Sequence, residues 1–294
     1  MTQTITVDGR DVRFERAEPA EGVHDDGPSI LLIHGINRSL DDWHDAQALL
    51  ARNHRVYSLD LPGFGLSDPL VGRVRLDLLA KACHDFLDTV GETRPVVVVG
   101  NSLGGAVALQ LAVSAPKRVA ALVLIDPAGF GREVTVVLRA LAIPVLGKRL
   151  LKGDRETLRR TERAIYFSGD HVTDERLDRA ALYGARPHNG RVLLETARAL
   201  GTVRGVRRRW RERLLASAAG LAIPIFVMWG RDDRILPATH LDNARRALPN
   251  ARFHLWDDTG HMAQVEHPGE FVDRVETFLT ESFPTGQHVT EDAR

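Results

Sequence analysis

Gly100-Asn101-Ser102-Leu103-Gly104 is the stretch of the chain that decides the fold. It follows the apolar run PVVVV (95–99) and precedes the small-residue run GAVALQLAVSA (105–115). This order is typical of a buried strand that turns sharply into a helix, and the tight turn needs glycines because a Cβ would clash there. The turn makes Ser102 a candidate nucleophile.

Strand-like and helix-like stretches alternate on both sides of this turn, which predicts an α/β fold with a mostly parallel sheet and helices on both faces. Two short alternating runs about Asp8-Gly9 predict a hairpin at the antiparallel edge. Six more strands are predicted from the runs SILLIHG (29–35), HRVYSLD (54–60), PVVVVGN (95–101), RVAALVLID (118–126), IPIFVMWG (223–230) and ARFHLW (251–256).

The alternation stops between residues 131 and 221, where helix-like stretches rich in Arg, Leu and Ala occur without a clear buried strand. We interpret this segment as a helical cap inserted into a core formed by residues 1–130 and 222–283. The polar residues 284–294 are expected to form a flexible tail.

Composition and charge bear on the possible partners and the location of the protein. The 294 residues carry no formal net charge, which argues against general nucleic-acid binding. Residues 131–213 contain 20 Lys and Arg against 10 Asp and Glu, so the cap has an excess of +10. The start of the chain does not resemble a secretory signal, and a cytoplasmic location is expected.

A serine nucleophile needs a base and a group that orients the base. Candidates follow two predicted strands: WGRDD (229–233) offers Asp232 and Asp233, and DDTGHMAQ (257–264) offers His261. Open α/β sheets place their sites at the carboxyl ends of parallel strands, where these loops are expected. The histidines lack metal-ligand spacing, and no G-x-G-x-x-G loop leads into a helix, so no metal and no cofactor is predicted.

Five motifs in order, IHGIN, DLPGFGLSD, GNSLGG, WGRDD and TGHMAQVEHP, resemble those of the α/β-hydrolase-fold serine hydrolases. The resemblance covers residues 27–282 and implies the α/β-hydrolase fold, with an eight-stranded sheet and an inserted cap. It also implies Ser102 as nucleophile, His261 as base and Asp233 as the acid. The backbone N–H groups of Ile36 and Leu103 would form the oxyanion hole.

Two branches of that family are similar to this chain: carboxylesterases or acylglycerol lipases, and C–C bond hydrolases that cleave ring-fission dienones. The first predicts hydrolysis of a carboxylic ester through an acyl-enzyme on Ser102. The alternatives are C–C hydrolysis, acyl transfer with the same three residues, and a non-catalytic binding protein on this fold. The expected partner is a small acyl substrate that is apolar or carries an anionic group.

Four further residues are candidates for contact with the substrate. Asn101 would lie beside the site, and Arg186 is one cap arginine that could hold a substrate carboxylate. Asn37 and Met262 stand where the C–C hydrolases usually have, respectively, a Gly-rich loop and a tryptophan. These two departures weaken the assignment to the C–C branch.

The mainly apolar segment Val134 to Leu146 is followed by Lys148 and Arg149. One interpretation is a lid helix whose apolar face covers the site. The other is an interfacial segment, so that the basic cap makes peripheral contact with a membrane. The oligomeric state is left open.

Overall fold

The computed structural model describes residues 2–21, 27–151 and 154–284. Eight strands form one sheet in the order β1-β2-β4-β3-β5-β6-β9-β10. The strands are β1 (Thr2–Val7), β2 (Arg10–Ala17), β3 (Ile30–Ile33), β4 (Val56–Leu59), β5 (Val96–Asn101), β6 (Val119–Ile125), β9 (Ile225–Gly230) and β10 (Arg252–Trp256). β2 is antiparallel to β1 and β4, and the other neighbouring strands pair in parallel. The predicted fold class is confirmed.

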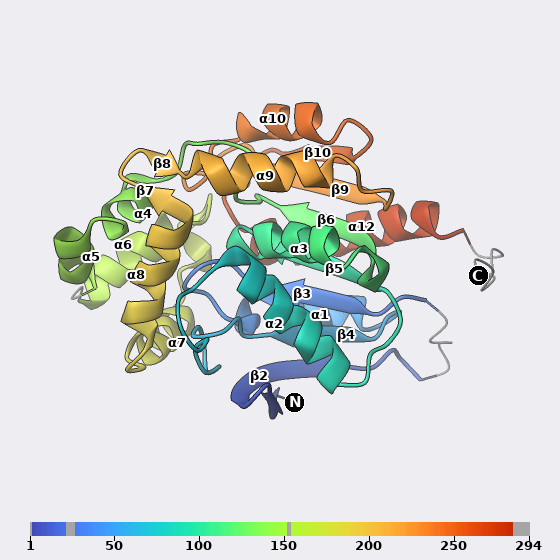
Figure 1. The fold of residues 1–294 in the computed structure, drawn as a ribbon, viewed down its shortest axis with the longest axis horizontal. Helices are drawn as coiled ribbons and strands as arrows, with labels where there is room; N and C mark the ends of the chain where they lie inside the picture. Colours follow the sequence, from blue (N-terminus) through green and yellow to red (C-terminus); the bar gives the residue numbers. More distant parts are fainter. Residues whose placement is uncertain (1, 22–26, 152–153, 285–294) are drawn as a thin grey trace.

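The central strands β3, β5, β6 and β9 are mainly apolar and buried because both faces of the sheet are covered there. Within β3, Leu31 and Ile33 face one hydrophobic cluster, whereas Ile30 and Leu32 face the other. In Figure 1, α2, α3 and α9 lie on one face and α12 lies on the opposite face. The helices on the sheet are α1 (His44–Leu50), α2 (Leu76–Thr89), α3 (Leu103–Ser114), α9 (Arg208–Ala218), α10 (His240–Ala247), α11 (Ala263–Glu266) and α12 (Pro268–Ser282), with short 3-10 helices η1 (Leu40–Trp43) and η2 (Pro116–Arg118).

The N-terminal hairpin turns at Asp8-Gly9, as the sequence predicts. Both residues have positive φ, +50° and +72°, which a two-residue turn of this twist requires. β1 and β2 thereby form the antiparallel edge of the sheet.

A helical insertion lies between β6 and β9, at one end of the molecule (Figure 1). Its elements are α4 (Val136–Leu141), α5 (Pro144–Leu150), α6 (Arg155–Arg163), η3 (Gly169–His171), α7 (Asp174–Gly184), α8 (Asn189–Leu200) and the short antiparallel strands β7 (Gly201–Thr202) and β8 (Gly205–Val206).

The structure differs from the sequence-based boundaries of the cap in one respect. Helix α9 lies within the predicted range 131–221, yet it packs against α3, and its Leu214 and Ala218 belong to the main core cluster. Its surface is basic, but its apolar residues cover the sheet layer. Residues 285–294 of the predicted tail lie outside the described residues. No helix of the described chain is both long enough and apolar enough to cross a membrane.

Candidate active site

Ser102 lies in the turn between β5 and α3. Its backbone is held at φ +56° and ψ −115°, a conformation that non-glycine residues seldom adopt. The turn is so tight that a Cβ on Gly100 would be 2.3 Å from the carbonyl oxygen of Gly104, and one on Gly104 would be 2.1 Å from that of Ile33. Two backbone hydrogen bonds hold Ser102 in this conformation. Its N–H donates to the carbonyl of Ile125, and its carbonyl accepts from the N–H of Ala128, both at 2.9 Å.

Asp233 and His261 form a buried hydrogen-bonded pair. Nδ1 of His261 lies 2.7 Å from Oδ2 of Asp233, and the two side chains are 7% and 0% exposed. The other carboxylate oxygen accepts hydrogen bonds from the backbone N–H groups of Ile235 (2.7 Å) and Leu236 (3.0 Å). Asp232 is half-buried instead, and its N–H donates to the carbonyl of Thr259. Of the two adjacent aspartates, the structure brings Asp233 to the histidine.

Asn101 joins the serine turn to the histidine loop. Its buried side-chain amide donates to the main-chain carbonyls of His261 (2.9 Å) and Ile125 (3.2 Å). Ser102 therefore follows directly on a residue that is bonded to His261. In the structure this amide joins the ends of β5 and β6 to the histidine loop. Contact between Asn101 and a substrate stays a prediction.

Asp126 is a second buried carboxyl group that the sequence analysis does not single out. It follows β6, and its Oδ1 accepts a 2.8 Å hydrogen bond from the N–H of Gly230. Burial, followed by repulsion from Asp233, raises its pKa well above the usual range. The protonated form of Asp126 is therefore favoured in the folded protein. The signal was available, since Asp126 ends an apolar run just as the other site loops do.

Among the described residues, Asp126, Asp233 and His261 are the one group of three potential metal ligands, with ligand atoms within 4.8 Å of one another. Two atoms bound to one zinc ion at about 2 Å each are separated by roughly 3 Å or more. Nδ1 and Oδ2 are 2.7 Å apart, which is a hydrogen-bond distance. The arrangement fits a shared proton better than a shared metal ion.

Glu266 organises the histidine loop and connects it to the insertion. Its Oε1 accepts from the backbone N–H groups of Gly260 (3.0 Å) and Met262 (3.4 Å), and its Oε2 accepts from that of Phe167 (2.6 Å). The N–H of His261 donates to the carbonyl of Ile165 at 2.7 Å. The segment between α6 and η3 is thus fastened to the loop that carries the imidazole.

Arg38 fastens the insertion to the loop after β3. Its guanidinium donates to both oxygens of Asp42 at 2.7 Å and also pairs with Glu162 of α6. Although burial opposes it, the charges of Asp42 and Glu162 raise the pKa of Arg38 well above its usual range. The hydroxyl of Tyr166 completes this contact. The insertion is therefore held by buried charges on the core.

The structure also places the other residues that the sequence predicts for the oxyanion hole and for substrate contact. Leu103 begins α3, so its N–H belongs to the first helical turn, whose donors have no acceptor within the helix. Ile36 is half-buried after β3, and Asn37 is exposed with φ +56°. Met262 is buried against Tyr166 of the insertion. Arg186 donates to the carbonyl of Leu66 at 3.4 Å, at the seam between insertion and core.

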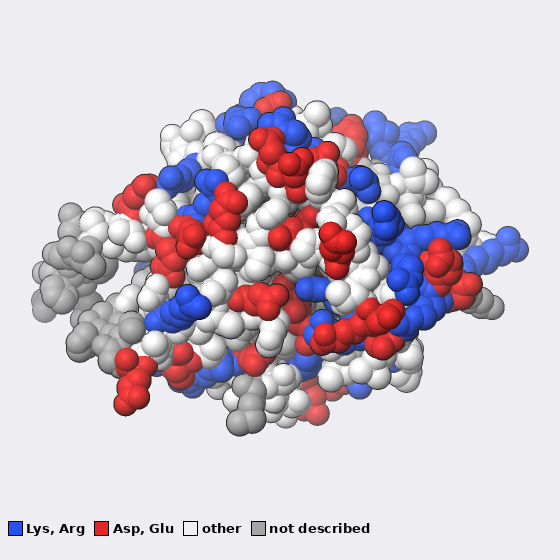
Figure 2. Space-filling view, turned by 180° about the vertical axis from the view of Figure 1, so that it is seen from behind, with Lys and Arg blue, Asp and Glu red and all other residues white. Residues whose placement is uncertain are grey.

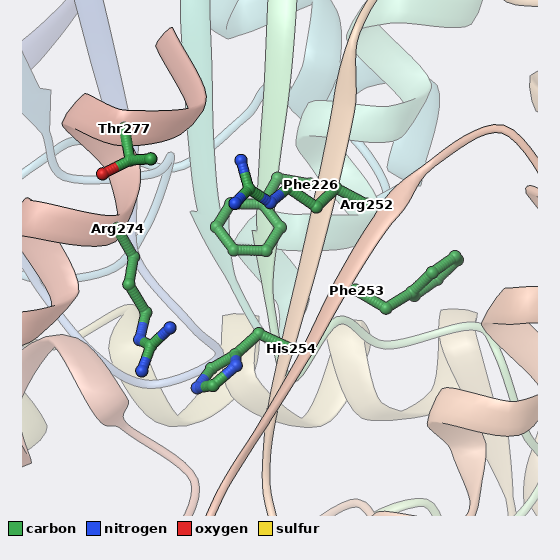
Figure 3. A pocket seen from close by; sticks show the side chains of 6 residues that line it. All are labelled: Phe226, Arg252, Phe253, His254, Arg274 and Thr277. Atoms are coloured by element: carbon green, nitrogen blue, oxygen red, sulfur yellow. The ribbon is translucent and has the colours of Figure 1, made fainter. Parts of the chain in front are cut away.

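A separate hollow of about 160 Å³ lies between α12 and strands β9 and β10. Figure 3 shows Phe226, Arg252, Phe253, His254, Arg274 and Thr277 around it. The guanidinium of Arg252 lies over the ring of Phe226, and that of Arg274 over the ring of Trp256. Because Phe226 and Arg252 are near the amino ends of their strands, this hollow is at the opposite end from Asp233 and His261. Its arginines are engaged by the protein's own rings.

Comparison with known proteins agrees with this architecture. A family model described as the alpha/beta hydrolase fold matches residues 28–268, and the chain belongs to that family. An uncharacterized protein of Mycobacterium tuberculosis is 30% identical over 268 residues, covering 88% of this chain and 77% of the relative. A 2-hydroxy-6-oxononadienedioate/2-hydroxy-6-oxononatrienedioate hydrolase of a Pseudomonas species is 30% identical over 263 residues, covering 85% and 87%.

Among solved structures, a putative lipase of Acinetobacter baumannii has a TM-score of 0.81 with 22% identity, covering 96% of this chain and 91% of the other. At this identity the likeness shows the shared fold.

Proposed function

We propose that this protein is a serine hydrolase that cleaves a carboxylic ester, or a related acyl substrate, through an acyl-enzyme on Ser102. The observation that carries the proposal is the buried pair between Asp233 and His261. Asn101, the residue before Ser102, donates a hydrogen bond to the carbonyl of this histidine. A carboxylate on Nδ1 fixes the imidazole tautomer that leaves Nε2 free to accept a proton. The strained turn presents the hydroxyl at the start of α3.

In the proposed reaction, His261 Nε2 takes the hydroxyl proton while Ser102 Oγ bonds to the substrate carbonyl carbon. The N–H groups of Leu103 and Ile36 stabilise the oxyanion, an effect worth about 3 kcal/mol for one such donor. The tetrahedral intermediate expels the alcohol, which receives the proton from His261. Water then attacks the acyl-enzyme by the same steps, releasing the acid and restoring Ser102. Asp233 stabilises the imidazolium in both halves.

A second candidate is hydrolysis of a C–C bond in a ring-fission dienone. It is favoured by the name of the Pseudomonas relative, which is 30% identical over 263 residues. Acyl transfer to an acceptor other than water would use the same residues if the insertion excluded water.

Hydrolysis of p-nitrophenyl butyrate and of a ring-fission dienone, followed by absorbance, tests the proposal. We expect ester turnover that falls at least about 10³-fold in Ser102→Ala, with circular dichroism unchanged. Turnover of the dienone alone would favour the C–C reaction, and ester products formed with an added alcohol would favour transfer. Ester turnover that persists in Ser102→Ala would overturn the mechanism.

A further inference from the structure

Helices α4 and α5 form a hairpin at the outer end of the insertion, which is the end furthest from α12 in Figure 1. Both helices contact α8. Leu141 is buried, and a Cβ on Gly147 would lie 2.7 Å from both the carbonyl oxygen of Leu141 and the side chain of Leu194. One side of the hairpin is thus packed tightly on the insertion, and the other side faces outward.

The outward side is unusually apolar. Of the eleven large hydrophobic side chains that are exposed in the described part of the chain, six lie between residues 136 and 151. Their exposed fractions are 66% for Val136, 48% for Val137, 68% for Val145, 40% for Leu146, 40% for Leu150 and 38% for Leu151. Single exposed apolar residues are normal on a soluble protein, whereas a contiguous group marks a contact surface. We call this group the α4–α5 surface.

All charged residues of the same stretch are basic. Residues 134–151 include Arg139, Lys148 and Arg149 and no acidic residue. Lys148 and Arg149 are exposed, and Arg149 is four residues after Val145, so the two share one face of α5. Figure 2 shows Lys and Arg side chains gathered at the end of the molecule that the insertion occupies.

We propose that the α4–α5 surface docks on an anionic lipid bilayer, with its valines and leucines inserted at the interface and its basic side chains on the head groups. Apolar residues flanked by Lys and Arg are the features that bind interfacial segments to anionic membranes. A second copy of the chain fits this surface less well. In a twofold contact, Lys148 and Arg149 of both copies would be brought together without an acidic partner from residues 134–151.

Flotation with vesicles of phosphatidylcholine, alone or with 30% phosphatidylglycerol, tests this proposal in the full-length protein. We expect the wild-type protein to float with the mixed vesicles at low salt and to be released at high salt. Val145→Asp and Lys148→Glu should each weaken binding about fivefold or more. The matched controls are Leu182→Asp, which alters another exposed leucine of the insertion (60% exposed), and Lys117→Glu, beside the amino end of β6. They should float like the wild type.

Other outcomes would overturn the proposal. Wild-type protein that stays soluble with both vesicle types shows that the surface does not bind anionic lipid. A dimer in sedimentation velocity that Val145→Asp dissociates would assign the surface to a second copy. Hydrolysis of a soluble ester by the same variants is measured in parallel. The docking proposal does not depend on the proposed function, so the variants should hydrolyse the ester at the wild-type rate.

Discussion

The side-chain amide of Asn101 donates a 2.9 Å hydrogen bond to the main-chain carbonyl of His261. This bond joins the residue before Ser102 to the loop that presents the imidazole, while a second bond joins it to the end of β6. The buried amide therefore links the turn that carries Ser102 to the loop that carries His261.

Removing this amide should loosen the site. In Asn101→Ala the carbonyl of His261 loses this donor, whereas that of Ile125 keeps the N–H of Ser102. An unsatisfied buried polar group costs about 1–3 kcal/mol. We expect a lower free energy of unfolding in urea and a kcat reduced at least about tenfold, with a smaller change in KM. A kcat within twofold of the wild-type value would show that the bond does not position His261.

Asp233 and Asp232 are adjacent, yet only the first contacts the imidazole. Asp233→Asn should reduce kcat by about 10³- to 10⁴-fold, because an amide at Nδ1 favours the wrong tautomer. Asp232→Asn serves as the matched control and should change kcat less than threefold. Steady-state kinetics of both variants distinguishes the two residues, and equal losses would contradict the assignment.

Asp126 should make stability depend on pH. Burial, followed by the charge of Asp233 and, more weakly, that of Glu266, raises the pKa of its carboxyl group. A folded-state pKa above the unfolded value means that the folded protein holds the extra proton. The stability is thus greatest at acidic pH and is lost as the pH rises through the folded pKa.

Asp126→Asn keeps a donor towards Asp233 and removes this titration. We expect the melting temperature of the variant to fall less than that of the wild type between pH 5 and pH 8. Activity should stay within about threefold of wild type. Since the contribution of Glu266 is common to both proteins, the difference reports Asp126. Parallel pH curves would mean that Asp126 is not protonated in the folded state.

Glu266 is expected to stabilise the histidine loop by accepting hydrogen bonds from its backbone N–H groups. In the wild-type protein both carboxylate oxygens of Glu266 accept hydrogen bonds from backbone N–H groups. Glu266→Gln replaces one of these oxygens by an NH₂ group, which cannot accept such a bond. We therefore predict a loss of about 1–3 kcal/mol in stability and a lower kcat. Glu270→Gln removes only a surface ion pair with Arg274 and should change stability by less than about 0.5 kcal/mol. Indistinguishable urea midpoints would exclude the supporting role.

The sheet and the placement of the loops could be predicted from the sequence because buried parallel strands appear as apolar runs. The run at 95–101 and the glycines of the following turn report local geometry that a single sequence displays directly. The runs ending near Gly230 and Trp256 place Asp233 and His261 at the same edge for the same reason.

Contacts between loops could not be predicted in this way. The role of Glu266 depends on Phe167, which is 99 residues away, and Arg38 meets Glu162 across 124 residues. Helix α9 shows the same difficulty. Its arginines led to its assignment to the insertion, whereas its Leu214 packs in the main core. Pattern and spacing describe each segment, but not which segment it meets.

The most direct test of the proposed mechanism is to label the protein with a fluorophosphonate and locate the adduct by mass spectrometry of its peptides. We predict one adduct on the Oγ of Ser102, no labelling of Ser102→Ala, and strongly slowed labelling of Asp233→Asn. An adduct on a different residue, or undiminished labelling of Ser102→Ala, would contradict the assignment of Ser102 as the nucleophile.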